Sequence, residues 1–500
     1  MADRASAKKL SGLVGMLQEI AGPDRVILDA AERDFYSADL FFSGATAAII
    51  VQPGTRDELA ATVRAVTGEG IAVVPRGGGL SYTRGYVPQR AECVLVDMRR
   101  VDRIVEIHPD DMFVTVEAGC TWAALHAALA PHGLRVPHFG PASGRVSTIG
   151  GGLSQNSVFF GSGTAGTAAD CVLSLEIVLA NGEILRTGSA GIDGGSPFLR
   201  YHGPDLSGLF LGDCGTLGVK SAGTFRLQRT PNGVACASFA FRSFEAIIAA
   251  QTQIAREQIA AECLGLGTYV PTPARHRGAS PSGGAAAPPG LHLVVEGRDE
   301  TDAAARLDLL RPIAAREGTE VEPVVPRALR ADPFGFVNSP LDEQGRLQAW
   351  THGIVPLSRA PGLYAALVAF LDEWAEEMAR HTIEVTVSTL VAGNALLLEP
   401  VLYWHDTPRP IHLWSMSEAP AQGGQGAHKA NPAATETVVE LRGGLRDLFA
   451  RERVAHLQIG KYYNYLGGLD PAACAAVKGI KTVLDPHGLM NPGALGLATD

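Results

Sequence analysis

Four glycines lie within the twelve residues of VPRGGGLSYTRG, which runs from Val74 to Gly85 directly after a short apolar stretch. Consecutive glycines that follow a strand allow main-chain N–H groups to converge on an anion, which in proteins is usually a phosphate. One glycine would be enough for a tight turn, whereas three in a row also let a ligand approach the backbone closely. We therefore interpret this stretch as a phosphate-binding loop.

Two further glycine motifs resemble nucleotide-binding loops but depart from them. Gly212–Ser221 is similar to the loop of nucleoside-triphosphate-binding proteins, but its lysine is displaced by one residue. Gly161–Gly166 reads Gly-x-Gly-x-x-Gly, a pattern that in a Rossmann fold must open a helix. The alternating residues Val172–Leu179 predict a strand instead, which Asn181-Gly182 turns into a hairpin. We therefore expect neither kind of site.

The elements around the first loop predict a β-α-β unit. Ala47–Gln52 is typical of a strand, Thr55 and Glu58 form a capping box that opens a helix, and Ile71–Val74 predicts the next strand. After residue 230 the pattern is typical of an antiparallel sheet with helices on one side. In that part we expect helices near 244–261, 302–316 and 361–380, strands near 383–391 and 395–404, and a loop rich in Pro, Gly and Ala at 271–290.

Length and composition limit the class of protein. Five hundred residues exceed one ordinary core, and a net charge of −10 argues against binding to nucleic acids or anionic membranes. No apolar run reaches the ~20 residues that a transmembrane helix needs, and the amino terminus lacks the features of a signal peptide. Seven scattered cysteines without a CxxC pair fit reduced thiols, with neither disulfides nor a zinc site. We expect a cytoplasmic protein of two or three domains.

Six segments occur in the order found in one known family. After VPRGGGLSYTRG come Ser147–Gly152 with Asn156, then Gly166–Asp170, Asp205–Phe210, Gly212–Val219 and Leu484–Gly493. Over about 45–230 and 455–500 the chain thereby resembles the vanillyl-alcohol oxidase / p-cresol methylhydroxylase (PCMH) family of FAD-binding oxidoreductases.

The resemblance implies an α+β fold. Residues 1–230 would form a PCMH-type FAD-binding domain of two α+β subdomains, with its core at about 45–230. Residues 231–454 would form a cap domain, with an antiparallel sheet flanked by helices, and 455–500 would return to the FAD domain. In that family the glycine loop gives its amides to the diphosphate of FAD, a second segment lies along the diphosphate and isoalloxazine, and a third holds the adenine end. The implied FAD-binding residues are Arg76, Gly77, Gly78, Gly79, Leu80, Ser81 and Tyr82; Pro141, Ala142, Ser143, Thr148, Gly150, Gly151 and Asn156; and Gly215, Val219 and Asn491.

We expect the FAD to be bound without a covalent bond. Some relatives carry a linking histidine directly after the loop glycines, where this chain has Leu80. Others attach the flavin from the cap, and His352 is the alternative linking residue there. We favour an ordinary polar role for His352.

The resemblance also bears on the catalytic groups. Metal-dependent relatives carry a histidine ligand after a Gly-Asn pair, but here Gly393-Asn394 precedes Ala395 and leucines, so no metal ion is expected. Tyr462 matches the tyrosine with which para-phenol oxidases hold a phenolate, and Tyr463 replaces their arginine. His456 and His405 are the candidate acid–base groups, because histidine titrates near neutral pH. Alternation would place Glu399, Val401, Tyr403 and His405 on one face of a strand; alternatively, His405 only caps that strand.

These residues predict an FAD-dependent dehydrogenase or oxidase. A small hydroxylated organic substrate, an alcohol or 2-hydroxy acid, would give a hydride to N5 of the flavin. One alternative is a para-substituted phenol oxidase of the vanillyl-alcohol oxidase type. Another is non-redox flavin chemistry, as in alkyl-glycerone-phosphate synthesis, or a flavin-bearing binding protein. The electron acceptor is open among oxygen, a cytochrome and a quinone, and a homo-oligomer is possible.

Overall fold

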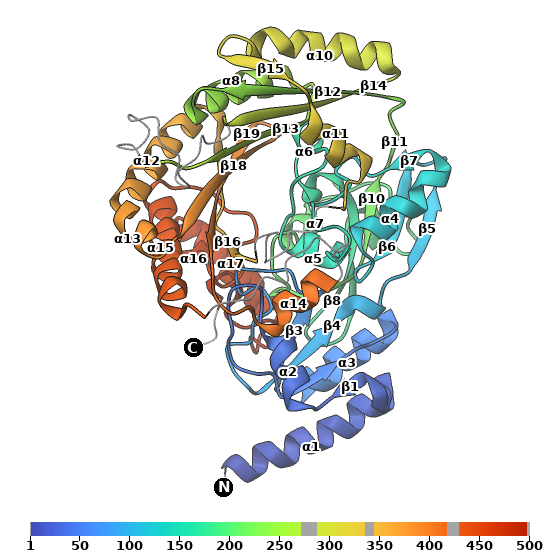
Figure 1. The fold of residues 1–500 in the computed structure, drawn as a ribbon. Coiled ribbons are helices and arrows are strands. Elements are labelled where there is room, and N and C mark those ends of the chain that lie inside the picture. Colours follow the sequence, from blue (N-terminus) through green and yellow to red (C-terminus); the bar gives the residue numbers. More distant parts are fainter. Residues whose placement is uncertain (1, 272–287, 336–344, 418–429, 498–500) are drawn as a thin grey trace. The chain divides into compact units, whose positions relative to one another are not determined.

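The computed structural model describes residues 2–271, 288–335, 345–417 and 430–497 (Figure 1). The chain divides into two compact units. The first comprises Met1–Ser157, Ala168–Arg229 and Gln458–Asp500, and the second comprises Val158–Thr167 and Thr230–Leu457. Most of the loop expected at 271–290 lies outside the described residues.

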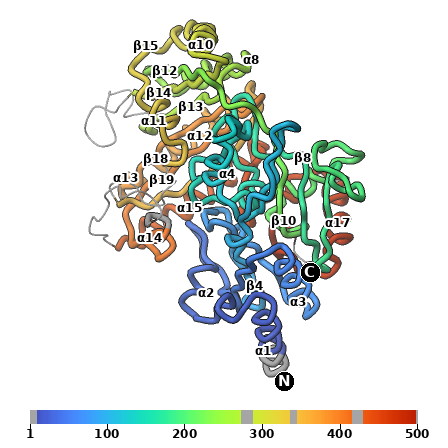
Figure 2. Tube along the Cα trace, turned by 90° about the vertical axis from the view of Figure 1, so that its right-hand side faces the viewer, coloured from blue at the N-terminus to red at the C-terminus, as the bar shows by residue number. Residues whose placement is uncertain are grey.

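The first unit begins with a four-stranded sheet in the order β1-β2-β4-β3. Strands β2 and β3 both run parallel to β4, and every residue of β2 and β4 is buried, as in parallel sheets covered on both faces. Helix α3 begins after Thr55, whose side chain accepts a hydrogen bond from the Glu58 amide, and α1 packs along α3 (Figure 2). Strand β3 ends at the glycine loop. The bounds are β1 (Val26–Ile27), β2 (Ile49–Val51), β3 (Ala72–Arg76), β4 (Cys93–Asp97), α1 (Ala2–Ala21), α2 (Ala30–Ser37) and α3 (Arg56–Gly68).

A second, five-stranded antiparallel sheet completes this unit, in the order β5-β6-β10-β8-β9. The hairpin predicted at Asn181-Gly182 joins β8 to β9. Arg56 of α3 contacts the buried carboxylates of Glu117 (3.4 Å) and Glu176 (3.0 Å), so ion pairs join α3 to this sheet. The bounds are β5 (Ile104–His108), β6 (Phe113–Glu117), β8 (Val172–Val178), β9 (Ile184–Arg186), β10 (Val219–Arg226), the short pair β7 (Leu134–Arg135) and β11 (Gln228–Arg229), α4 (Trp122–Leu129), α5 (Ile149–Ser154), α7 (Leu206–Leu209), α16 (Tyr465–Gly468) and α17 (Pro471–Leu484).

The C-terminal segment extends the first sheet. After α17, the chain runs beside β3, where the Val73 amide donates to the Leu489 carbonyl and the Asn491 amide donates to the Val73 carbonyl, both at 2.8 Å. The buried Lys481 ammonium fixes this segment, because it contacts Asp485 (2.6 Å) and the Thr216 carbonyl (2.7 Å). The end of the chain thus supports the strand that carries the glycine loop.

The second unit is built on an eight-stranded antiparallel sheet. Its order is β15-β12-β14-β13-β18-β19-β16, and β17 also pairs with β19. Helices α8, α10 and α12 pack on one face of this sheet (Figure 1). The predicted fold, α+β with two subdomains in the first part and an antiparallel sheet flanked by helices in the second, is confirmed. The strands are β12 (Gly233–Phe241), β13 (Ala260–Thr268), β14 (Gly290–Gly297), β15 (Gly318–Val321), β16 (Leu347–Trp350), β17 (Gly353–Pro356), β18 (Glu384–Ala392) and β19 (Ala395–Trp404).

Two helices of this unit differ from the sequence expectation. The helix expected to reach 261 ends at Glu257, because Gln258 adopts a left-handed conformation (φ 55°) and β13 begins at Ala260. The helix expected at 361–380 is interrupted at Trp374.

None of the helices in the described part of the chain combines the length and apolar character needed to cross a bilayer. The helices are α6 (Ser162–Ala165), α8 (Phe244–Glu257), α10 (Glu300–Ala314), α11 (Val324–Ala331), α12 (Ala360–Glu373), α13 (Ala375–Arg380), α14 (Pro410–Ser417) and α15 (Pro432–Arg451).

Asp485→Ala is expected to destabilise the first unit by about 3–5 kcal/mol, because it leaves the Lys481 ammonium buried without its counter-charge. The change also removes the acceptor of the Leu489 and Met490 amides. Urea unfolding measures the effect. Asp447→Ala, which breaks an exposed ion pair with Arg446, is the control and should cost less than about 1 kcal/mol. Equal stability of the two variants would contradict the prediction.

Candidate cofactor and substrate site

The glycine loop lies against the segment that precedes α5. A Cβ atom added to Gly78 would lie 2.2 Å from the Val146 carbonyl oxygen, and one added to Gly77 would lie 2.3 Å from Thr148 Oγ1. Neither position has room for a side chain. A glycine is therefore required at 78 by the approach of two backbones and at 77 by the Thr148 side chain, and the predicted residues of both segments lie side by side.

The loop presents a row of main-chain donors. Among the residues that the structure describes, the amides of Gly78, Gly79, Leu80 and Ser81 have no hydrogen-bond acceptor. Gly79 has a positive φ of 76°, which turns the chain so that successive N–H groups can face one side. The Ser81 side chain is engaged elsewhere, since its Oγ accepts from the Gly85 amide at 3.2 Å. The arrangement suits a phosphate or another anion.

Arg76 adds a buried cation beneath this loop. Its side chain is 1% exposed, and its guanidinium carbon lies 4.9 Å from the ring centre of Tyr36 and 5.1 Å from that of Tyr86. Its Nε and Nη2 atoms have no hydrogen-bond partner among the described residues. A buried guanidinium with unpaired donors is costly unless an anion completes it. The residues present therefore fit a diphosphate.

The second predicted segment is a capped turn of helix. Thr148 opens α5, and its Oγ1 accepts from the Gly151 amide at 3.2 Å. Gly150 and Gly151 are half-buried, so their backbone is accessible to a ligand. Pro141 is also half-buried, whereas Ala142 and Ser143 are buried. Asn156 uses its side-chain oxygen within the protein, where it accepts from the Ala169 amide at 3.2 Å.

Asn491 joins the end of the glycine loop to the third predicted segment. Its Nδ2 donates to the carbonyls of Gly85 (2.8 Å) and Cys214 (2.6 Å), while its buried Oδ1 has no partner among the described residues. Gly215 follows with a φ of 72°, and Val219 begins β10. Three stretches that are distant in sequence therefore meet in this unit. Leu80 and Tyr82 belong to the same loop, Leu80 half-buried and Tyr82 buried.

The two candidate tyrosines lie in the first unit beside an aromatic residue that sequence reasoning missed. The rings of Tyr462 and Tyr463 are 5.1 Å apart, and Tyr462 lies 5.3 Å from Phe42. The Lys461 amide donates to the Thr83 carbonyl at 2.9 Å, which fixes the pair next to the glycine loop. Tyr463 is 3% exposed and Tyr462 is half-buried. The double phenylalanine in Asp39-Leu-Phe-Phe42 was the available signal for this contact.

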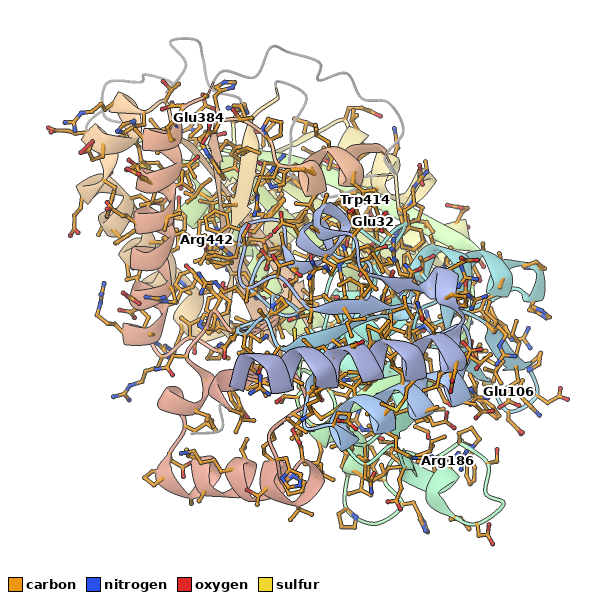
Figure 3. The ribbon with its side chains drawn as sticks, turned by 90° about the horizontal axis from the view of Figure 1, so that it is seen from below. Glu32, Glu106, Arg186, Glu384, Trp414 and Arg442 are labelled. Atoms are coloured by element: carbon orange, nitrogen blue, oxygen red, sulfur yellow. The ribbon has the colours of Figure 1, made fainter. Side chains whose placement is uncertain are left out.

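His456, a candidate acid–base group, and His352, the alternative linking residue, both lie in the second unit. The ring of His456 donates from Nδ1 to the His352 carbonyl at 2.9 Å, because a carbonyl can only accept. Burial lowers the pKa of His456 to about 4, and that of His352 to about 3. His456 is therefore neutral near pH 7, with its lone pair on Nε2. Arg442 of α15, which is labelled in Figure 3, donates from Nε to the Trp350 carbonyl at 3.1 Å.

His405 lies apart from this pair. Strand β19 ends at Trp404, so His405 follows the strand and is exposed. The expected alternation does hold for Glu399 and Tyr403, which are both half-buried. Ser388 Oγ donates to Glu399 Oε2 at 3.2 Å, and Thr386 Oγ1 donates to the Tyr403 hydroxyl at 3.3 Å. The end of β19 at Trp404 favours the alternative that His405 only caps the strand.

Several curated relatives match parts of the chain. The glycolate oxidase subunit GlcD of Bacillus subtilis is 31% identical over 217 residues, which cover 43% of this chain and 44% of the relative. The D-2-hydroxyglutarate dehydrogenase of Xanthomonas citri is 31% identical over 199 residues, 40% of each chain. The mitochondrial D-lactate dehydrogenase (cytochrome) of Arabidopsis thaliana is 32% identical over 37% of this chain and 30% of its own. The matches thus span less than half the length of each of these relatives.

Solved structures with the same fold match nearly the whole chain. A 4-ethylphenol oxidase from Gulosibacter chungangensis has a TM-score of 0.73 at 16% identity and covers 99% of this chain and 98% of its own. p-Cresol methylhydroxylase has a TM-score of 0.74 at 15% identity, with the same coverage. At such identities the likeness shows the fold.

Two family models match the segments that the geometry brings together. The FAD binding domain model covers residues 47–188, which include the glycine loop and α5. The model of the C-terminal domain of FAD-linked oxidases covers residues 461–495, which include Tyr462, Tyr463 and Asn491. The resemblance inferred from the sequence is confirmed: the chain matches the FAD binding domain and the C-terminal domain of FAD-linked oxidases, and its fold is that of p-cresol methylhydroxylase.

Proposed function

We propose that this protein is an FAD-dependent dehydrogenase or oxidase that takes a hydride from a small hydroxylated organic substrate, an alcohol or a 2-hydroxy acid. The main support is the set of donors at the glycine loop, four amides and the Arg76 guanidinium, that lack acceptors among the described residues. Relatives named glycolate oxidase, D-lactate dehydrogenase and D-2-hydroxyglutarate dehydrogenase support a 2-hydroxy acid as the donor.

The chain's own residues would hold the cofactor chiefly through its diphosphate. The amides from Gly78 to Ser81 would donate to its oxygens, and Arg76 would balance its charge. When bound, FAD supplies the hydride acceptor at N5. We place Thr148, Gly150 and Gly151 along the cofactor and Gly215 and Val219 at its adenine end, as the sequence resemblance implies.

We propose that the FAD is held without a covalent bond. Leu80 cannot form such a bond at the glycine loop. His352 is 1% exposed, and its Nε2 donates to the Leu457 carbonyl at 2.5 Å, so this nitrogen already serves the protein's own packing. Both observations favour reversible binding.

For the substrate, we propose that Tyr462 and Tyr463 contact it and that His456 accepts its hydroxyl proton. A tyrosine can hydrogen-bond a substrate oxygen and pack its ring on an apolar body. The neutral tautomer of His456, with Nδ1–H on a backbone carbonyl, is the form that a general base requires. His405 remains the second candidate base. We also propose that the reaction needs no metal ion, because leucines follow Asn394 where metal-dependent relatives carry a ligand.

A para-substituted phenol is the second candidate substrate. The contact between Tyr462 and Phe42 favours it, because two aromatic rings side by side suit an aromatic body. Non-redox flavin chemistry is the alternative from another class. Reduction of the flavin by substrate distinguishes the redox reactions from it.

Gly78→Val is expected to abolish FAD binding. The new side chain would collide with the Val146 carbonyl oxygen and separate the loop amides from the diphosphate. Loss of two charge-assisted hydrogen bonds, ~1.5–3 kcal/mol each, would weaken binding by roughly 10²–10⁴-fold. Flavin absorbance per protein measures the effect, and Gly479→Val, on the exposed face of α17, is the control. Normal flavin content in the Gly78 variant would refute the placement of the diphosphate.

Purified protein is expected to be yellow and to release intact FAD on acid precipitation. The reason is that Leu80 carries no nucleophilic atom and that His352 is buried with its Nε2 on the Leu457 carbonyl. The measurement is flavin absorbance in the supernatant and pellet. Flavin that stays with the pelleted polypeptide would contradict the proposal. The proteolytic peptide that carries the flavin would then identify the linking residue.

Anaerobic addition of the correct substrate is expected to bleach the flavin absorbance. A panel of alcohols, 2-hydroxy acids and para-alkylphenols, followed by rapid mixing, identifies the donor. His456→Ala should slow reduction by about 10²–10⁴-fold if His456 is the base. Because the pKa of His456 is lowered to about 4, the rate should fall only as the pH approaches 4, rather than near 6.5.

The controls are His405→Ala, Tyr462→Phe and Tyr463→Phe, each compared at full FAD content. A slow His405 variant beside a normal His456 variant would reassign the base. If Tyr462→Phe fails on phenols alone, the phenol is the substrate. If no member of the panel bleaches the flavin of the parent protein, the proposed reaction is wrong.

A further inference from the structure

Arg84 has an unusual backbone for an arginine. Its φ is 59°, in the left-handed region that glycine adopts without strain. Its amide donates to Asp39 Oδ2 at 2.7 Å, and the other oxygen of this buried carboxylate accepts from the amides of Phe41 (2.9 Å) and Phe42 (2.6 Å). One carboxylate therefore fixes both the backbone of Arg84 and the turn that carries Phe42.

The Arg84 side chain is held by an aromatic ring rather than by an acid. Its guanidinium carbon lies 4.1 Å from the ring centre of Phe42, the distance of a cation–π contact. Among the described residues, no carboxylate lies within ion-pair distance of this guanidinium and no acceptor takes a hydrogen bond from it. Arg99 and Arg200 in the same unit both have such partners, Asp97 and Asp205, at 2.8 Å. The charge of Arg84 is therefore oriented but not neutralised.

This cation stands next to the proposed substrate tyrosines. The Phe42 ring, which contacts the Arg84 guanidinium, also lies 5.3 Å from the ring of Tyr462. Leu40 of the same turn donates from its amide to the Ser81 carbonyl at 2.9 Å. Arg84 follows Ser81 by three residues on the glycine loop. A fixed guanidinium beside a row of aromatic rings suits an anion that has an apolar or aromatic body.

We propose that Arg84 binds the anionic oxygen of the substrate, with the body of the substrate against Phe42 and Tyr462. The inference rests on the proposed function and narrows it to substrates that carry an anion: an aryl-substituted 2-hydroxy acid through its carboxylate, or a para-alkylphenol through its phenolate. Arg84 is a binding and specificity residue; no bond is made or broken at it.

The test is Arg84→Gly, which removes the side chain and suits the left-handed backbone, so the fold and the FAD content are retained. Dissociation constants are measured by calorimetry with benzoate and with 4-methylphenol. KM is measured with 2-hydroxy-2-phenylacetate, with 4-ethylphenol and with benzyl alcohol, which carries no anion. The variant should weaken binding of the carboxylates, or of the phenols that Arg84 would hold as phenolates, by about 10- to 100-fold and leave benzyl alcohol unchanged. If only the carboxylate compounds bind more weakly, the substrate anion is a carboxylate; if only the phenols do, it is a phenolate.

Arg84→Lys and Arg90→Gly are the matched controls. The lysine variant keeps the charge without the planar donors and should recover part of the loss, whereas replacement of Arg90, which is exposed between the glycine loop and β4, should have no effect. Unchanged benzoate and methylphenol affinities in Arg84→Gly, or an equal loss for benzyl alcohol, would overturn the assignment. The binding measurements need no turnover, so an Arg84 effect on binding stands even if no substrate in the panel reduces the flavin, and that second result would reject only the proposed reaction.

Discussion

Main-chain donors without acceptors are the feature on which the first unit depends. The buried Arg76 guanidinium is expensive to desolvate, and the four consecutive amides beside it have no acceptor among the described residues. Gly77 and Gly78 touch Thr148 and the Val146 carbonyl too closely for any side chain. Strand β3 delivers the loop, and the C-terminal segment, fixed through Lys481 and Asp485, supports that strand. The fold thus holds an array of donors that suits an anion.

The sequence was most informative where function depends on backbone. Glycines at close approaches and turn residues such as Asn181-Gly182 act locally, so the loop, the hairpin and the order of the segments could be read directly. The end of α8 could not, because nothing in the residue type of Gln258 shows that it takes a left-handed conformation there. The exposed position of His405 depended on a strand that stops one residue earlier, a boundary that alternation alone does not set.

The aromatic cluster around Tyr462 was beyond sequence reasoning for a different reason. Phe42 reaches Tyr462 only because Asp39 folds its own turn and also accepts from the Arg84 amide, across a separation of 45 residues. Each of these residues has an ordinary role when taken alone. Only their arrangement in space shows that the buried Asp39 carboxylate accepts from backbone amides and forms no ion pair with the Arg84 guanidinium.

Aromatic rings hold two arginines of the glycine loop, and one of them, Arg84, has no carboxylate partner among the described residues. A carboxylate fixes a guanidinium but also cancels its charge, as Asp97 does for Arg99. An aromatic ring fixes the guanidinium through its quadrupole and leaves the N–H donors for a ligand. Arg84, exposed on Phe42, is held in this way. Arg76 is buried among Phe35, Tyr36 and Tyr86 and also interacts with the Asp97 carboxylate, while its Nε and Nη2 keep no hydrogen-bond partner among the described residues. Burial separates the tasks that we propose for them: the enclosed cation suits a diphosphate that stays bound between turnovers, whereas the exposed one suits an anion that must arrive and leave at every turnover.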